Sequence, residues 1–141
     1  LGLYFESTGQ VEREFATDGY RITWNGVAED VVVGEKCKID SVWCISGEGS
    51  DFISINFDRG MVRGSFDMRV DGEGIRSVST YTSDKTLING SVLEDFHRGI
   101  EEDIEGFERI RPEAESLLQK YGELLGIEET RRKWEFMKSP E

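Results

Sequence analysis

Residues 11–90 alternate between hydrophobic and polar positions in short runs, and glycine-containing turns separate the runs. The alternation is clearest over residues 61–71. One side of this segment carries Val62, Gly64, Phe66, Met68 and Val70, and the other carries Arg63, Ser65, Asp67, Arg69 and Asp71. A period of two is typical of a strand with one buried face. The pattern predicts about six strands, antiparallel in sequence order.

The first hairpin is predicted at Asp18-Gly19, because this dipeptide favours the positive φ values that a type I′ turn requires. The turn would place Phe15 opposite Ile22 and Arg13 opposite Trp24. Arg13 would then be positioned to stack on the Trp24 ring. One face of the hairpin is expected to carry Val11, Arg13, Phe15, Tyr20, Ile22 and Trp24.

Further strands are expected after this hairpin. Residues 31–39 contain Gly34 and are predicted to form one bent strand. The remaining strands are expected over residues 41–46, 51–58, 61–71 and 75–83.

From Ser91 the hydrophobic period changes to three or four residues, which predicts helix. Ser91 and Glu94 fit a capping box at its start, and Pro112 is expected either to bend the helix or to begin a second one. Gly126 is a plausible stop, and residues 127–138 form a last short amphipathic helix. The first apolar stripe is Leu93, Phe96, Ile100, Ile104, Phe107 and Ile110; it resumes with Ala114, Leu117, Leu118, Tyr121, Leu124 and Leu125.

The predicted fold class is α+β. A curved antiparallel sheet has to bury its apolar face, and the helical stripe is the large surface available to cover it. Residues 1–126 are expected to form a single domain, with residues 127–141 as a helical tail. A sheet curled around one helix often leaves a cavity between them, which bulky inward side chains would line.

Composition narrows the function classes. The 141 residues include eight Phe, four Tyr and three Trp, which is too aromatic for a disordered chain, and the formal charge is −12. Such a charge repels phosphate backbones, so nucleic acid and anionic membranes are poor partners. No apolar run approaches the roughly 20 residues of a transmembrane segment, and no secretion leader is expected from the pattern of the first residues. Cys37 and Cys44 are expected as small core residues of a cytoplasmic protein.

Residues 60–70 (Gly-Met-Val-Arg-Gly-Ser-Phe-Asp-Met-Arg-Val), residues 74–82 (Gly-Ile-Arg-Ser-Val-Ser-Thr-Tyr-Thr) and the helix predicted over 93–110 resemble the last strands and closing helix of START-like, helix-grip proteins. That SRPBCC superfamily includes polyketide cyclases and lipid-transfer domains. The resemblance covers about a third of the chain. The first 30 residues and the helix beyond Pro112 depart from the family pattern. The resemblance implies an apolar pocket for a lipid-like or polycyclic ligand and carries over no catalytic residue.

The candidate ligand-binding residues are those expected to face this pocket: Trp24, Trp43, Phe57, Phe66, Met68, Phe96, His97, Ile100 and Phe107. His97 is the only histidine, and it fits either a proton carrier or a boundary residue on an acidic helix. Arg63 and Arg69 fit either an anionic head group or pairing with neighbouring carboxylates. No catalytic set, metal site or cofactor is predicted.

Three function classes remain open. The first is a binding domain that holds a hydrophobic small molecule between sheet and helix. The second is an acidic protein-interaction module, such as an accessory subunit, a chaperone or an immunity-type protein. Its contacts, or those of a homodimer, would use an edge strand or the basic, aromatic segment 127–138. That segment is also expected to fold back on the Glu-rich helix. The third class is a cyclase- or isomerase-like enzyme in which His97 or a buried Glu moves a proton.

Overall fold

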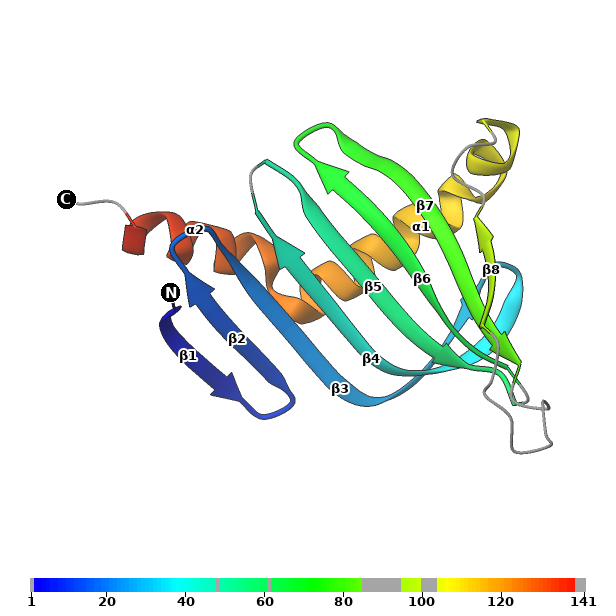
Figure 1. Ribbon diagram of the computed structural model, residues 1–141, viewed down its shortest axis with the longest axis horizontal. Coiled ribbons are helices and arrows are strands. Elements are labelled where there is room, and N and C mark those ends of the chain that lie inside the picture. Colours follow the sequence, from blue (N-terminus) through cyan, green and yellow to red (C-terminus); the bar gives the residue numbers. More distant parts are fainter. Residues whose placement is uncertain (1, 48, 61, 85–94, 100–103, 139–141) are drawn as a thin grey trace.

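A computed structural model describes residues 2–47, 49–60, 62–84, 95–99 and 104–138. They form an α+β fold, as predicted, in which each strand of one sheet pairs antiparallel with the strand before it (Figure 1). The sheet has eight strands where about six were expected. The elements are β1 (Gly2–Thr8), β2 (Val11–Ala16), β3 (Gly19–Val32), β4 (Glu35–Ser46), β5 (Asp51–Asp58), β6 (Val62–Asp71), β7 (Gly74–Asp84), β8 (Asp95–Gly99), α1 (Ile104–Leu125) and α2 (Ile127–Lys138).

The first hairpin turns one residue earlier than predicted. Ala16 pairs with Gly19, so Phe15 lies opposite Tyr20 and Arg13 lies opposite Ile22. The partner of each residue has therefore moved by two positions. Because side chains alternate with a period of two, such a shift keeps every residue on its predicted face.

The bent strand predicted over residues 31–39 is instead the end of a hairpin. Val33 (φ +53°) and Gly34 (φ +80°) form the turn between β3 and β4. The prediction failed because valine rarely adopts a positive φ and strongly favours strands. Two strands of 14 and 12 residues therefore replace the three shorter segments expected over residues 20–46.

The helix predicted from Ser91 is wrong over residues 95–99. These residues form β8, which pairs with residues 79–83 of β7. A short apolar run does not distinguish strand from helix by itself, and here the open edge of the sheet supplies backbone partners. The capping box at Ser91 and Glu94, and the stripe position Ile100, lie outside the described residues. Helix α1 begins at Ile104 and continues through Pro112.

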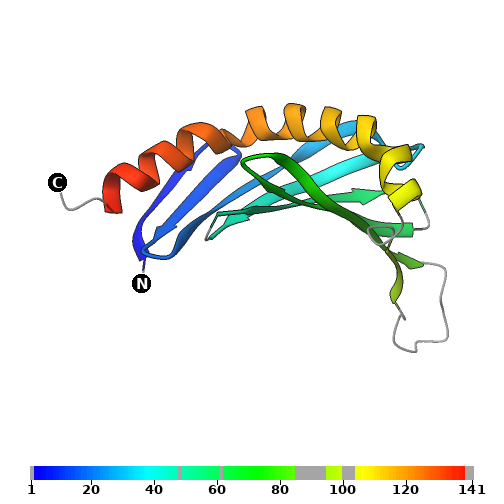
Figure 2. The ribbon, with the colours of Figure 1, turned by 90° about the horizontal axis from the view of Figure 1, so that it is seen from above.

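Both helices cover the same face of the curved sheet, which we call the inner face (Figure 2). Successive strands contribute one cross-strand row on this face: Ile22, Cys44, Ile53, Met68 and Val78. The helices contribute Ile110, Ala114, Leu117, Tyr121, Leu125, Ile127, Thr130 and Trp134, all buried. Leu124, expected on the stripe, is exposed. The described middle of the layer between sheet and helices is therefore a filled core.

The junction of the two helices is fixed by contacts with the first strands. Gly126 has a φ of +68° and ends α1 as predicted. The Arg13 guanidinium donates to Thr130 Oγ1 at 2.9 Å and to the Leu125 carbonyl at 3.3 Å, instead of stacking on Trp24. Helix α2 has the predicted bounds; it packs on β3 of the sheet and also contacts α1.

Candidate functional site

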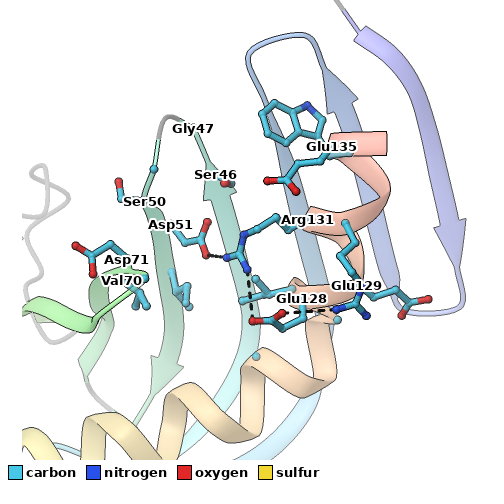
Figure 3. Close-up of a pocket in the computed structure, with 18 of the residues that line it drawn as sticks. Ser46, Gly47, Ser50, Asp51, Val70, Asp71, Glu128, Glu129, Arg131 and Glu135 are labelled. Atoms are coloured by element: carbon cyan, nitrogen blue, oxygen red, sulfur yellow. Dashed lines mark hydrogen bonds and ion pairs between the residues drawn. The ribbon is translucent and has the colours of Figure 1, made fainter. Parts of the chain in front are cut away.

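An open cleft of about 990 Å³ lies at one end of the inner face. Its strand side is formed by the ends of the β4–β5 and β6–β7 hairpins, with Ser46, Ser50, Asp51, Ile53, Val70 and Asp71. Its helix side includes Leu118, Gly122, Ile127, Arg131, Trp134 and Lys138. Figure 3 shows Arg131 and Glu135 pointing from α2 toward the β4–β5 hairpin, with Val70 and Asp71 beyond it. The cleft lies beside the junction of α1 and α2, at the edge of the hydrophobic core.

The cleft has apolar side chains from both layers. Ile53 and Val70 come from neighbouring strands, and Leu118, Ile127 and Trp134 come from the two helices. The Trp134 ring is held in place because its indole N–H donates to the Ala16 carbonyl at 2.6 Å. Tyr20 packs against the same ring at 5.7 Å between centroids. A volume of this size and an apolar lining are typical of small-molecule sites.

A partly buried ion pair joins the two sides of the cleft. Arg131 Nη2 lies 2.5 Å from Asp51 Oδ2, and the Asp51 side chain is only 7% exposed. Arg131 Nη1 also lies 3.5 Å from Glu128 Oε2 (Figure 3). Burial raises the pKa of the neighbouring Tyr20 to about 12. Asp51 therefore positions the Arg131 guanidinium, and Tyr20 is a neutral neighbour at physiological pH.

Acidic residues outnumber basic ones around the cleft. The acidic residues are Asp18, Asp51, Asp71, Glu123, Glu128, Glu129 and Glu135; the basic residues are Arg131, Arg132 and Lys138. A concave surface lined mainly by one sign of charge concentrates the opposite charge from solution. The cleft can therefore combine apolar contact with attraction for positive charge.

The predicted ligand-binding residues lie elsewhere. Trp24, Phe57, Phe66 and Met68 are buried in the core on the inner face. Trp43 lies on the opposite, outer face, where its ring centroid is 5.5 Å from that of Phe52. None of these five lines the cleft.

The described candidates that were predicted on one helix lie on two different elements, α1 and β8. Phe107 is partly buried at the start of α1, beneath the Arg111 guanidinium at 4.4 Å. Phe96 and His97 pair in register with Thr82 and Tyr81 of β7; their side chains, like Ile100, are outside the described structure. A proton-transfer role for His97 stays a prediction.

The basic candidates pair with neighbours on the outer face. Arg63 Nε lies 3.8 Å from Asp58 Oδ2, and Arg69 lies over the Phe52 ring at 5.1 Å. A second, more polar depression of about 510 Å³ adjoins Arg63 and includes Asn25, Ser41 and Asn56. Its walls are hydrogen-bonded to each other, since Asn56 Nδ2 donates to Ser41 Oγ at 2.9 Å. It offers less apolar surface than the cleft.

The cleft could not be predicted from the sequence because its residues come from hairpin ends and from both helices, which no single periodic pattern connects. The one available clue was the basic, aromatic segment 127–138, which supplies Arg131, Trp134 and Lys138. Both cysteines are buried and free, which agrees with their predicted place in the core. Among the described residues, no group of three or more His, Cys, Asp or Glu side chains could hold a metal ion. Neither described helix has the length and hydropathy needed to cross a membrane.

Comparisons with known proteins give no relative for this chain: no family model, curated protein or solved structure matches it.

Proposed function

We propose that this protein binds a small amphiphilic molecule in the cleft between the hairpin ends and the α1–α2 junction. The observation that carries the proposal is the composition of the cleft. Apolar side chains from the sheet and both helices share one concave volume of about 990 Å³ with a charged rim. An apolar ligand segment would pack against Ile53, Leu118 and Ile127 while its polar end reaches the rim.

The proposed ligand site differs from the one predicted from the sequence. The predicted pocket lay between the sheet and one helix, whereas the cleft lies at one end of the inner face. A pocket in the middle of the layer between sheet and helices would need free volume beside Trp24 and Phe66, but both side chains are buried in the core. The Trp24 ring lies 6.3 Å from the Tyr121 ring of α1, centroid to centroid. The helix-grip resemblance supports the proposal through its architecture alone, a curved antiparallel sheet covered by C-terminal helices; the pocket that it implies lies between sheet and helix.

Gly122 offers a direct test. It lines the cleft from α1, and a Cβ built on it meets only Ile127 Cδ1, at 3.9 Å. Gly122→Phe should place a ring in the cleft, whereas Gly122→Ala adds one methyl group and serves as the matched control. Nile red, a neutral apolar dye whose fluorescence rises in apolar surroundings, reports occupancy. The native protein and Gly122→Ala should bind the dye saturably at one site, and Gly122→Phe should bind it about tenfold more weakly.

The stability of each variant is measured by thermal unfolding, so that a folding defect is not mistaken for a blocked cleft. Native-like binding by a folded Gly122→Phe variant would contradict the proposal. The absence of saturable dye binding by the native protein would contradict it as well.

A second candidate function, protein association, is favoured by the exposed apolar residues near strand β1. Phe5 is 56% exposed on β1, and Phe136 of α2 is 79% exposed. Lys133 of the same helix contacts Glu6 of β1, with Nζ–Oε1 at 3.2 Å. Phe5 and Phe136 therefore both lie at the end of the molecule where β1 forms the sheet edge. Light scattering of the native protein and of Phe5→Glu tests this function: a dimer that the substitution dissociates would support it, and a monomer in both would contradict self-association.

A further inference from the structure

The basic residues of the cleft already have partners, whereas several of its carboxylates do not. Arg131 contacts Asp51 and Glu128, and Arg132 Nη1 lies 3.7 Å from Glu128 Oε1. Within the described residues, Glu123, Glu129 and Glu135 form no ion pair. The charge left for a ligand to neutralise is therefore negative.

The remaining cation of the cleft, Lys138, lies on an aromatic ring. Its Nζ is 4.0 Å from the centre of the Trp134 ring. Because the face of an indole ring is electron-rich, it attracts ammonium groups, and the attraction grows when water is displaced. The Ala16 hydrogen bond fixes this ring at the cleft wall. The position of the Lys138 ammonium group thus shows that a positive charge is favourable beside the Trp134 ring.

We infer that the cleft selects ligands with a cationic head, of the alkylammonium class, and that the head replaces Lys138 over Trp134. This inference rests on the proposed function, because it names the ligand class for the same site. The apolar chain would pack between Ile53 and Leu118. The ammonium group would then lie beside the Trp134 ring, with the carboxylate of Glu135 on the same helix turn.

Three probes with the same octyl chain separate head-group preference from apolar binding: octyltrimethylammonium, octyl glucoside and octanoate. Each is titrated into the native protein by calorimetry below its micelle concentration. The ammonium probe should bind about tenfold more tightly than octanoate, because their heads differ in the sign of one charge. Its affinity should fall as salt is added, since salt screens exposed charges.

Lys138→Ala provides the specific test. Removing the competing ammonium should raise the affinity for octyltrimethylammonium about three- to tenfold. Lys120→Ala is the matched control, because Lys120 also lies over an aromatic ring, Tyr121 at 5.3 Å, but does not line the cleft. It should change this affinity less than about twofold.

Equal effects of the two lysine substitutions would overturn the inference, as would octanoate binding at least as tightly as the ammonium probe. If octyl glucoside and octanoate bind while octyltrimethylammonium does not, the inference fails and the proposed function stands. If no octyl probe binds and Nile red does not bind, both fail.

Discussion

Two glycines four residues apart are predicted to respond to alanine in opposite directions. Gly122 lies inside α1, and its carbonyl accepts a hydrogen bond from the Gly126 N–H at 3.0 Å. A Cβ at Gly122 has only ordinary contact distance to Ile127. Gly126 separates α1 from α2 with a φ of +68°, and a Cβ there would lie 3.0 Å from Arg13 Nη2. Helical geometry therefore favours a side chain at the first position and opposes one at the second.

The magnitudes follow from the backbone conformations. Glycine inside a helix costs about 0.8–1 kcal/mol relative to alanine, so Gly122→Ala should raise the free energy of unfolding by about 1 kcal/mol. A left-handed conformation costs a non-glycine residue roughly 1–2 kcal/mol, so Gly126→Ala should lower it by about that amount. For a chain of 141 residues, 1 kcal/mol corresponds to a change in Tm of about 3 °C.

Urea unfolding followed by circular dichroism measures both variants, with thermal unfolding as a second method. The midpoint should rise for Gly122→Ala and fall for Gly126→Ala, with unchanged urea dependence in both. A lower stability of Gly122→Ala would contradict a helix α1 that is continuous up to Leu125. A neutral Gly126→Ala would refute the left-handed junction with α2.

Three further predictions concern buried groups. Trp134→Phe should lower the free energy of unfolding by about 1–3 kcal/mol, because it removes the indole N–H that bonds to the Ala16 carbonyl. Trp43→Phe, at a partly buried ring on the outer face, should cost less in the same urea assay. Burial raises the pKa of Tyr20 from its ordinary 10 to about 12, so the folded state holds this proton longer than the unfolded chain does. Stability should therefore fall as the pH rises from about 10 to about 12, and Tyr20→Phe should lessen that fall; identical pH profiles would contradict the assignment. Burial also raises the pKa of the Cys44 thiol well above its usual range, so in a Cys37→Ala background a thiol reagent should label Cys44 only as fast as the protein unfolds, and faster labelling would show local access.

Strands with strict alternation could be predicted from the sequence. The inner face of β6 follows from its hydrophobic period, and Phe66 and Met68 are buried there as expected. The faces of β2 and β3 were also correct although their register was not, because a shift of two residues preserves the alternation. Local period therefore determines which side of a strand is buried, while the pairing depends on the turn geometry.

The errors arose where the sheet overrode local preference. Val33 occupies a left-handed turn position that its β-branched side chain disfavours. Two long strands of paired backbone, β3 and β4, outweigh that local cost. Residues 95–99 continue the sheet beside β7 although their spacing also fits a helix. Neither outcome depends on neighbouring residues in the chain alone, so a local pattern could not predict it.

The cleft required the tertiary structure. Asp51 and Arg131 are 80 residues apart in the chain, and neither lies on a predicted binding stripe. The basic segment 127–138 was recognised as unusual, but its position beside the β4–β5 hairpin depends on the left-handed junction at Gly126. The sequence therefore identified the segment but did not predict the cleft that it helps to form.

The most direct test of the proposed ligand site is a methyl NMR spectrum of isoleucine- and valine-labelled protein with and without saturating Nile red. The dye is aromatic, so its ring currents shift the signals of adjacent methyl groups. The account predicts that Ile53, Val70 and Ile127, which line the cleft, shift strongly, while the buried core residues Ile39 and Val78 keep their free positions. Shifts centred on Ile39 and Val78, with the three cleft residues unchanged, would place the ligand inside the sheet–helix layer and contradict the account.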